Sequence, residues 1–289
     1  MSSHPPALVL RDVRRRFDHA AMHFDSADFV HRLAFDELLQ RLSPVKLQPR
    51  RILDLGCATG SGSTPLKRRF RGSRVIGMDA SFAMLQCNAR KKPLFAKRPA
   101  VQGDAARIPL KDGSIDLVVA NMLLPWIDDL DGCLAEIARV TRKDGLFAFA
   151  TCGPDSLSEI RKAWLSVDEH WHVNAYPDMH DIGDALLRAG LRDPVLDVDY
   201  LTVTYRDTDD LYRDLTSAGA RNCLSGRQKT LTGKRRFRAM DRSLAAQKNE
   251  GVLSLRLELV YGHAWGSGRC PPAGEFHLDP ALISRRRHA

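Results

Sequence analysis

Apolar side chains recur along the first part of the chain with the period of a helix. Between residues 12 and 42 they return about every 3.6 residues, which predicts helical structure. The segment 43–50 breaks this period with two prolines, which predicts a linker into the core. The helical positions concerned are Phe29, Val30, Leu33, Leu38, Leu39 and Leu42.

From residue 51 onward the pattern changes to short apolar runs separated by helical stretches. Nearly continuous apolar runs are typical of parallel strands that are covered on both faces. The chain therefore predicts an α/β fold with a Rossmann-like, seven-stranded, mostly parallel sheet and helices on both of its faces. The predicted strands are 52–56, 74–79, 100–104, 115–122, 145–151, 195–205 and 252–265.

These patterns divide the chain into parts with different expected roles. Residues 1–48 are expected to form a helical cap on the substrate side, and residues 49–265 the main domain. A basic, helical insertion is expected at about 206–250, before the last strand, and a tail at 266–289. Predicted helices lie near 131–142 and 181–189, the second ending at Gly190, and a further helix ends near Gly219.

The net charge of the chain indicates which kinds of partner it could bind. The formal net charge is +9 and the isoelectric point is about 9.4. Basic residues gather at 67–74, 90–98 and 221–238, and the last stretch contains no acid. A basic surface speeds encounters with acidic partners, such as nucleic acid, anionic lipid or an acidic protein, although an ordinary solvated surface explains it equally well.

Cysteine spacing and hydropathy bear on the compartment. The six cysteines include no C-x-x-C pair, which favours neither a zinc site nor a disulfide framework and indicates a reducing compartment. No apolar run approaches the roughly 18 residues of a membrane helix, and the first residues do not resemble a secretory signal. We therefore expect a cytoplasmic protein without a membrane partner.

The turn after the first predicted strand carries the strongest chemical signal. A glycine-rich turn after a parallel strand lets a ligand approach the backbone at the carboxyl edge of the sheet. Here small residues stand at every second position of the turn, namely Gly56, Ala58 and Gly60, and Asp54 lies inside the preceding strand. That acid would repel a pyrophosphate but suits a cationic amino-acid ligand carrying a sulfonium.

Further candidates follow the next strands. Asp79 closes the second strand, where an acid can accept hydrogen bonds from ribose hydroxyls. Met84 can pack on an adenine face, and Asp104 with Ala105 follows the third strand, where Asp104 can accept from the adenine amino group. Each acid alone could equally be a helix cap or turn residue. Their recurrence at successive strand ends favours a cofactor site.

Residues after the fourth and fifth strands bear on the substrate. The segment from Asn121 to Trp126 does not match the Asn/Asp-Pro-Pro-Tyr motif, which binds a substrate amino group. We expect Asn121 to contact either the cofactor or the substrate. Cys152 lacks the companion Pro-Cys of RNA cytosine methyltransferases, so we expect a small buried residue. His170, His172 and His180 lie in a loop-like stretch, and no His/Cys cluster has the spacing of metal ligands.

The region 50–150 resembles class I S-adenosylmethionine-dependent methyltransferases through these glycine, Asp79 and Asp104 positions. Beyond that core, the chain resembles the biotin-pathway malonyl-[acyl-carrier-protein] O-methyltransferase family over about residues 12–265. It departs from that family at Pro125, usually Gln, and at Phe24, often Tyr. The matching stretches are 14–21, 121–126, 128–130, 151–160, 167–168, 172–174, 178–181, 215–220, 226–227, 231–233 and 261–265.

This resemblance implies S-adenosyl-L-methionine as cofactor and the free carboxylate of a malonyl thioester as methyl acceptor. The carboxylate is ionised at neutral pH, so the transfer requires no general base. The thioester would be carried by an acyl carrier protein or by coenzyme A, and an acidic carrier would give the basic stretch 221–238 a partner. Substrate-side candidates are His19, Asn121, Trp126, His172 and Arg227.

Two other readings remain open. One is another enzyme of this fold, either a methyltransferase acting on a protein or small molecule, or a relative of the mitochondrial complex I assembly factor that hydroxylates an arginine. The other is a non-enzymatic protein that binds the cofactor or associates with RNA through its basic surface. We expect an enzyme, and we do not expect nucleic acid as a partner.

Overall fold

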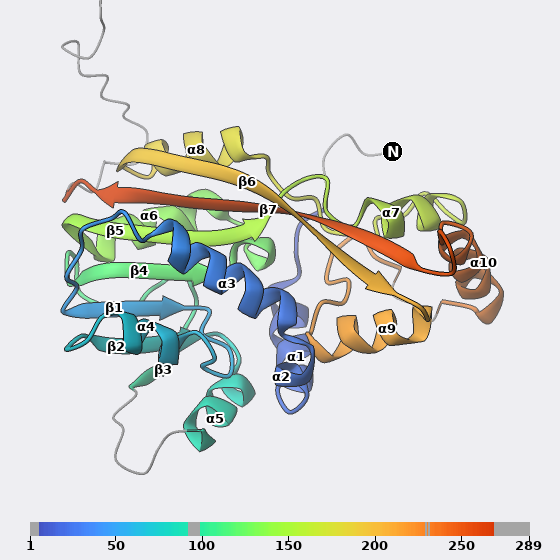
Figure 1. The fold of residues 1–289 in the computed structure, drawn as a ribbon, viewed down its shortest axis with the longest axis horizontal. Coiled ribbons are helices and arrows are strands. Elements are labelled where there is room, and N and C mark those ends of the chain that lie inside the picture. Colours follow the sequence, from blue (N-terminus) through green and yellow to red (C-terminus); the bar gives the residue numbers. More distant parts are fainter. Residues whose placement is uncertain (1–5, 92–98, 229, 231, 269–289) are drawn as a thin grey trace, which may run out of the picture.

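The seven predicted strands form one mixed sheet (Figure 1). The structure is a computed structural model that describes residues 6–91, 99–228, 230 and 232–268. The strand order is β3-β2-β1-β4-β5-β7-β6; the first five are parallel, and β7 is antiparallel to both of its neighbours. The strands are β1 (Arg51–Leu55), β2 (Arg74–Asp79), β3 (Ala100–Gln102), β4 (Ile115–Asn121), β5 (Thr141–Cys152), β6 (Leu191–Tyr205) and β7 (Leu253–Gly266).

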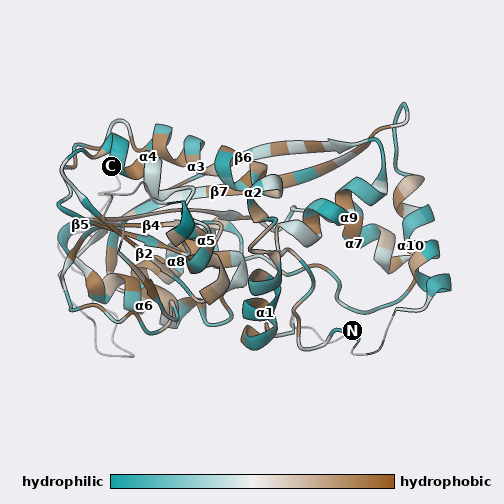
Figure 2. Ribbon diagram, turned by 90° about the horizontal axis from the view of Figure 1, so that it is seen from below, coloured by the Kyte–Doolittle hydropathy of each residue, from teal (hydrophilic) through white to brown (hydrophobic). Residues whose placement is uncertain are grey.

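Helices cover both faces of this sheet, as the sequence predicts. Alternate residues of β4 point to opposite faces, so Leu117 packs under α3 (Phe29–Arg41) and α4 (Ser63–Arg69). Its neighbour Val118 packs under α6 (Leu130–Val140) and α8 (Met179–Arg188). Both residues are fully buried. Brown, hydrophobic ribbon is accordingly concentrated in the central strands (Figure 2).

Strands β6 and β7 run on beyond the rest of the sheet and carry a second, smaller core (Figure 1). Around their far end pack α7 (Ser158–Leu165), α9 (Thr208–Ser217) and α10 (Lys234–Ala245). Helices α9 and α10 fall within the expected basic insertion, which is helical as predicted. This end of the molecule therefore extends away from the main sheet.

The helical stretch predicted for residues 12–42 is divided into three helices. They are α1 (Leu10–Ala20), α2 (Phe24–Ala27) and α3, separated by a turn at 21–23 and by Asp28. No glycine or proline causes the division. Instead, Phe24 is buried against Met84 of α5 (Phe82–Arg90), and the Thr59 hydroxyl donates to Asp25 over 2.5 Å. Tertiary contacts thus redirect the chain where local sequence carries no stop signal.

Some expectations fall on residues outside the described ranges. Most of the basic stretch 90–98 and of the tail 266–289 belongs to them, as do Lys229 and Leu231. Within the described ranges, no helix is both long and apolar enough to cross a membrane.

Candidate functional site

The turn after β1 opens the carboxyl edge of the sheet to a ligand. Gly56 and Gly60 have φ of +74° and +83°, and Ala58 between them has φ of +45°. The Gly56 N–H donates to the Met78 carbonyl over 2.8 Å, which holds the turn against β2. A side chain at Gly60 would place its Cβ 2.4 Å from the Asn88 amide oxygen. The turn therefore keeps its shape through close packing that only glycine permits at this position.

A cavity of about 570 Å³ lies beyond this turn, at the ends of β1, β2 and β4. Asp79 lines it and accepts the backbone N–H groups of Ala58 over 2.9 Å and of Ser81 over 2.8 Å. Burial raises the pKa of Asp79, and these two donors oppose that shift. Asp104 and Ala105 line the same cavity. Besides Gly56 and Ala58, four residues that were predicted to bind the cofactor line this cavity: Asp79, Asp104, Ala105 and Asn121.

A second cavity, of about 250 Å³, lies on the other side of the glycine turn and contains Asp54. The Asp54 side chain is 3% exposed and accepts the Ser63 hydroxyl over 2.6 Å. Burial raises the pKa of Asp54 to about 6, the Ser63 hydrogen bond opposes the shift, and nearby Asp79 adds to it. A buried carboxyl with so little compensation is suited to a cationic group of a ligand.

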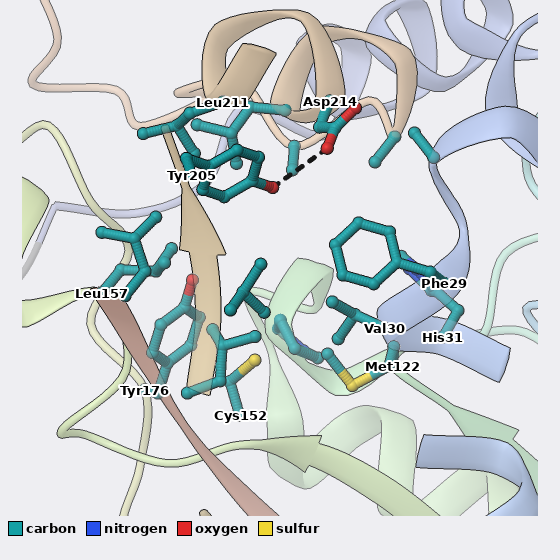
Figure 3. Close-up of a pocket in the computed structure, with 18 of the residues that line it drawn as sticks. Phe29, Val30, His31, Met122, Cys152, Leu157, Tyr176, Tyr205, Leu211 and Asp214 are labelled. Carbon is teal, nitrogen blue, oxygen red and sulfur yellow. Dashed lines mark hydrogen bonds between the residues drawn. The ribbon is translucent and has the colours of Figure 1, made fainter. Parts of the chain in front are cut away.

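The third cavity is mostly apolar and lies between α3, the end of β5 and the extended part of β6 (Figure 3). Its volume is about 120 Å³. Phe29, Val30 and His31 stand on one side, across from Tyr205 and the other residues of the extended strands. The Tyr205 hydroxyl donates to Asp214 over 3.0 Å. Such a pocket offers few hydrogen-bonding groups and suits a short, largely apolar ligand.

Cys152 lines this apolar cavity but has the properties of a core residue. Its side chain is 6% exposed, and burial raises the pKa of the thiol to about 12. The thiolate, not the thiol, is the nucleophile, so this cysteine is unreactive at neutral pH. The expectation of a small buried residue is therefore met.

The three cavities meet at residues of β4 and the N-terminal helices. Asn121 lines the two cavities beside the glycine turn, and Trp126 lines the largest and the apolar one. Phe17 of α1 packs edge-on against Trp126, with ring centroids 5.2 Å apart. His31 lines all three cavities. The structure thus brings two of the predicted substrate-side residues, Asn121 and Trp126, to the junction.

His31 is a site residue that the sequence analysis missed. In α3 the buried positions Ala34, Phe35 and Leu38 form one face, and His31 precedes them by one helical turn on that face. A histidine on the apolar face of an otherwise amphipathic helix was the available signal.

The other predicted residues lie away from the walls of these cavities. His19 is exposed on α1. His172 stacks on Trp164 and its Nε2 lies 2.9 Å from an oxygen of Asp168. Arg227 pairs with the buried carboxylate of Asp12.

Two further residues that were predicted to bind the cofactor, Met84 and Gly60, lie outside the walls of the three cavities. Met84 is 0% exposed, in a small core with Ala20, Ala21 and Phe24, so it does not reach the wall of the largest cavity. Gly60 packs against Asn88 of α5. Within the described residues, no group of three or more His, Cys, Asp or Glu side chains is placed to hold a metal ion.

Several known proteins are similar to this chain in sequence and in fold. Residues 53–149 match the family described as "Methyltransferase domain". The chain is 40% identical over 283 residues to the malonyl-[acyl-carrier protein] O-methyltransferase of Halorhodospira halophila, with 96% of each chain covered. It is 42% identical over 259 residues to the protein of that name from Methylovorus sp. strain MP688, with 88% of each chain covered.

Solved structures agree on the fold. The YcgJ protein of Bacillus subtilis is similar with a TM-score of 0.56 and 14% identity, over 80% of this chain and 97% of that one. A SAM-dependent methyltransferase from Thermotoga maritima is similar with a TM-score of 0.53 and 19% identity, over 88% of this chain and 99% of that one. At such low identity these structures speak only to the shared architecture.

Proposed function

The chain belongs to the malonyl-[acyl-carrier protein] O-methyltransferase family, and we propose that it methylates the free carboxylate of a malonyl thioester in an early step of biotin synthesis. The observation that carries this proposal is the similarity at 40% identity over nearly the whole length of a relative so named. That span includes helices α1 to α3 and strands β6 and β7 as well as the glycine turn after β1.

The cofactor is S-adenosyl-L-methionine, and the residues present fit it. Gly56 offers backbone without a side chain, Asp79 keeps lone pairs for ribose hydroxyls, and Asp54 offers a buried carboxyl to the cationic amino acid. Asp104, Ala105, Ala58 and Asn121 complete the set that we propose to hold it. When bound, the cofactor supplies an electrophilic methyl group, which a carboxylate oxygen accepts while the electron pair of the broken bond stays on sulfur.

The chain's own contribution is to exclude water and fix the acceptor. A carboxylate needs no base, so the reaction depends on positioning and on a dry pocket in which opposite charges neutralise each other. The apolar third cavity, which shares Trp126 and Met122 with the cavity of Asp79, fits that requirement. We propose that α1, α2 and α3 act as the cap over this site, since their residues line all three cavities.

We propose an acidic acyl carrier protein as the partner that delivers the malonyl group. Lys234, Arg235 and Arg238 are exposed in the first turns of α10. This helix lies at the same end of the molecule as α9, whose residues line the apolar cavity. Exposed cations there would attract an acidic carrier, with neither a membrane nor nucleic acid required. A cytoplasmic location is supported by Cys57, Cys87, Cys133, Cys152 and Cys223, which are all free thiols.

Mass spectrometry tests the proposal directly. Malonyl carrier protein incubated with this protein and S-adenosylmethionine should gain one methyl group, removable by mild ester hydrolysis. Acetyl carrier protein, which lacks the free carboxylate, should gain none. Methylation of neither substrate would overturn the assignment and favour another activity of the fold.

A further inference from the structure

His31 lines all three described cavities, and no other residue lines more than two of them. It is the one residue common to the cavity of Asp54 and the apolar cavity, and it also lines the large cavity of Asp79. His31 therefore lies at the junction of the apolar cavity with the two cavities beside the glycine turn. The ring is held edge-on against Phe24, with centroids 5.1 Å apart and planes at 62°. Figure 3 shows His31 with Phe29 and Val30 on one side of the apolar pocket, near Met122.

The hydrogen bonding of this imidazole is incomplete. Nδ1 is sealed from solvent and has no hydrogen-bond partner among the described residues. Nε2 likewise has no partner within those residues, but it is not fully buried, and His31 lines the cavities, so we infer that Nε2 points toward them. Burial lowers the pKa of His31 to about 4, and the ring is neutral at physiological pH.

The geometry favours one tautomer. A sealed N–H without an acceptor is rarer in proteins than a sealed lone pair without a donor. The proton therefore belongs on Nε2, where it faces the cavity as a donor. A neutral donor in a pocket with few polar groups can bind an acceptor on the ligand.

Asn121 holds His31 in this position. Its amide nitrogen donates to the backbone carbonyl of His31 over 2.9 Å, which ties the first turn of α3 to the end of β4. Tyr176 and Trp126 also line this pocket with a hydroxyl and an indole N–H, whereas two other polar groups there do not suit an anion. The Tyr205 hydroxyl already donates to Asp214, and the Asp214 carboxyl would repel a carboxylate.

We propose that His31 contacts the substrate, its Nε2–H donating to one oxygen of the malonyl carboxylate so that the other oxygen faces the cofactor methyl. This inference rests on the proposed function. The step itself forms one oxygen–methyl bond and breaks one methyl–sulfur bond, whose electron pair stays on sulfur. His31 neither gains nor loses a proton in it.

The test compares the binding of two thioesters to the complete protein. Malonyl-coenzyme A and acetyl-coenzyme A are titrated calorimetrically in the presence of S-adenosylhomocysteine, which prevents turnover. In His31→Leu the dissociation constant of malonyl-coenzyme A should rise on the order of tenfold to a hundredfold, the loss of a hydrogen bond to a charged group. Acetyl-coenzyme A should bind as before. His31→Gln, which keeps a neutral donor, should recover most of the loss.

A matched control comes from His263 of β7. This partly buried histidine has a pKa lowered by burial and lies outside the walls of the three cavities. His263→Leu should leave the malonyl preference unchanged. S-adenosylhomocysteine binding, measured in each variant, reports that the cofactor side remains folded.

Two results would overturn the inference: unchanged malonyl-coenzyme A binding in His31→Leu, or an equal loss for both thioesters. If His31→Leu does not fold, the ¹⁵N shift of Nε2 in the unmodified protein decides, since malonyl-coenzyme A must perturb it and acetyl-coenzyme A must not. Methyl transfer by the unmodified protein separates the two failures. A protein that methylates malonyl thioesters but binds them without His31 loses only this inference, whereas one that never methylates them loses both.

Discussion

Asp54 combines deep burial with a single side-chain donor, and this sets its ionisation. Because burial raises its pKa to about 6, the carboxyl is largely protonated at pH 5 and ionised at pH 7.5. Only the ionised form can neutralise the positive charge of the cofactor's amino acid. Cofactor affinity should therefore increase about tenfold from pH 5 to pH 7.5, with a midpoint near 6, the factor expected for one unit of titration. Calorimetric titration across this range checks the prediction.

The raised pKa of Asp54 also makes the free energy of unfolding depend on pH. A carboxyl whose pKa is raised on folding contributes stability at pH values below its ordinary pKa and loses it as the pH rises through about 6. The cofactor should consequently raise the melting temperature more at pH 7.5 than at pH 5. Ser63→Ala removes the donor that favours the ionised form, so the midpoint should move upward. Asp54→Asn should give weak, pH-independent binding; a pH dependence that persists in this variant would assign it to another group.

Gly60 shows how one missing Cβ shapes the glycine turn. In Gly60→Ala the new Cβ meets the Asn88 amide oxygen at 2.4 Å, on a backbone with φ of +83°. Gly72 is a matched control, since its φ of +86° is similar but nothing lies within 4 Å of the added atom. Gly72→Ala should cost about 1 kcal/mol of unfolding free energy for backbone strain. Gly60→Ala should cost about 1–3 kcal/mol more for overpacking.

Urea unfolding of both variants gives this comparison, and cofactor binding adds a second readout. Gly60→Ala should also weaken S-adenosylhomocysteine binding, because Ala58 and Gly56 belong to the same turn. Equal destabilisation in the two variants would mean that the contact with Asn88 relaxes at no cost.

At the scale of elements, α1 is held over the largest cavity by a contact with the start of α5. Asp18 accepts the Ser81 hydroxyl over 2.6 Å and the Ala83 N–H over 3.3 Å, while Phe17 and Arg14 line the cavity below. Asp18→Ala removes both contacts, so α1 should open more often. Cofactor dissociation should then become about tenfold faster, the effect of losing one hydrogen bond to a charged group. Stopped-flow displacement of bound S-adenosylhomocysteine measures the rate.

A control for this prediction is Asp184→Ala, which removes an exposed acid on α8, away from the cavities. It should leave the dissociation rate unchanged. If Asp18→Ala also leaves it unchanged, α1 is held by its apolar contacts alone.

The elements also show which parts of the structure the sequence could predict. The seven strands and the helix stop at Gly190, with φ of +85°, followed from apolar runs and glycine chemistry, which act locally. The three-way division of the N-terminal helices did not follow, because it depends on the burial of Phe24 against Met84. Sequence spacing cannot reveal a contact between residues sixty positions apart.

The site divides in the same way. The position of Asp54, Asp79 and Asp104 beside the cavities could be predicted, because parallel strands bring their carboxyl ends to one edge of the sheet. His31 was less apparent, because the packing of α3 across the end of β4 is what brings it to the junction of the three cavities. Arg227 looked suited to a substrate carboxylate, yet it pairs with Asp12, a partner 215 positions away.

At the scale of the whole molecule, the net charge of +9 is distributed over both ends, so position as well as charge must be tested. Lys234, Arg235 and Arg238 are exposed at the end that carries α10, whereas Lys67 and Arg71 are exposed near α4 at the other end (Figure 1). Exposed charges act mainly by steering encounter over about 8 Å at physiological salt. Charge reversal at α10 should therefore lower kcat/KM for malonyl carrier protein several-fold and leave kcat unchanged.

The same reasoning fixes the controls. Turnover of malonyl-coenzyme A should respond less, because it is a much smaller anion, and binding of S-adenosylhomocysteine should not respond at all. Added salt should reduce the difference between the unmodified protein and the α10 variant, since screening removes the attraction in both. Reversal of Lys67 and Arg71 near α4 should have a smaller effect if the carrier docks beside the apolar cavity. Equal effects from the two ends would mean that overall charge, and not a docking surface on α10, governs the encounter.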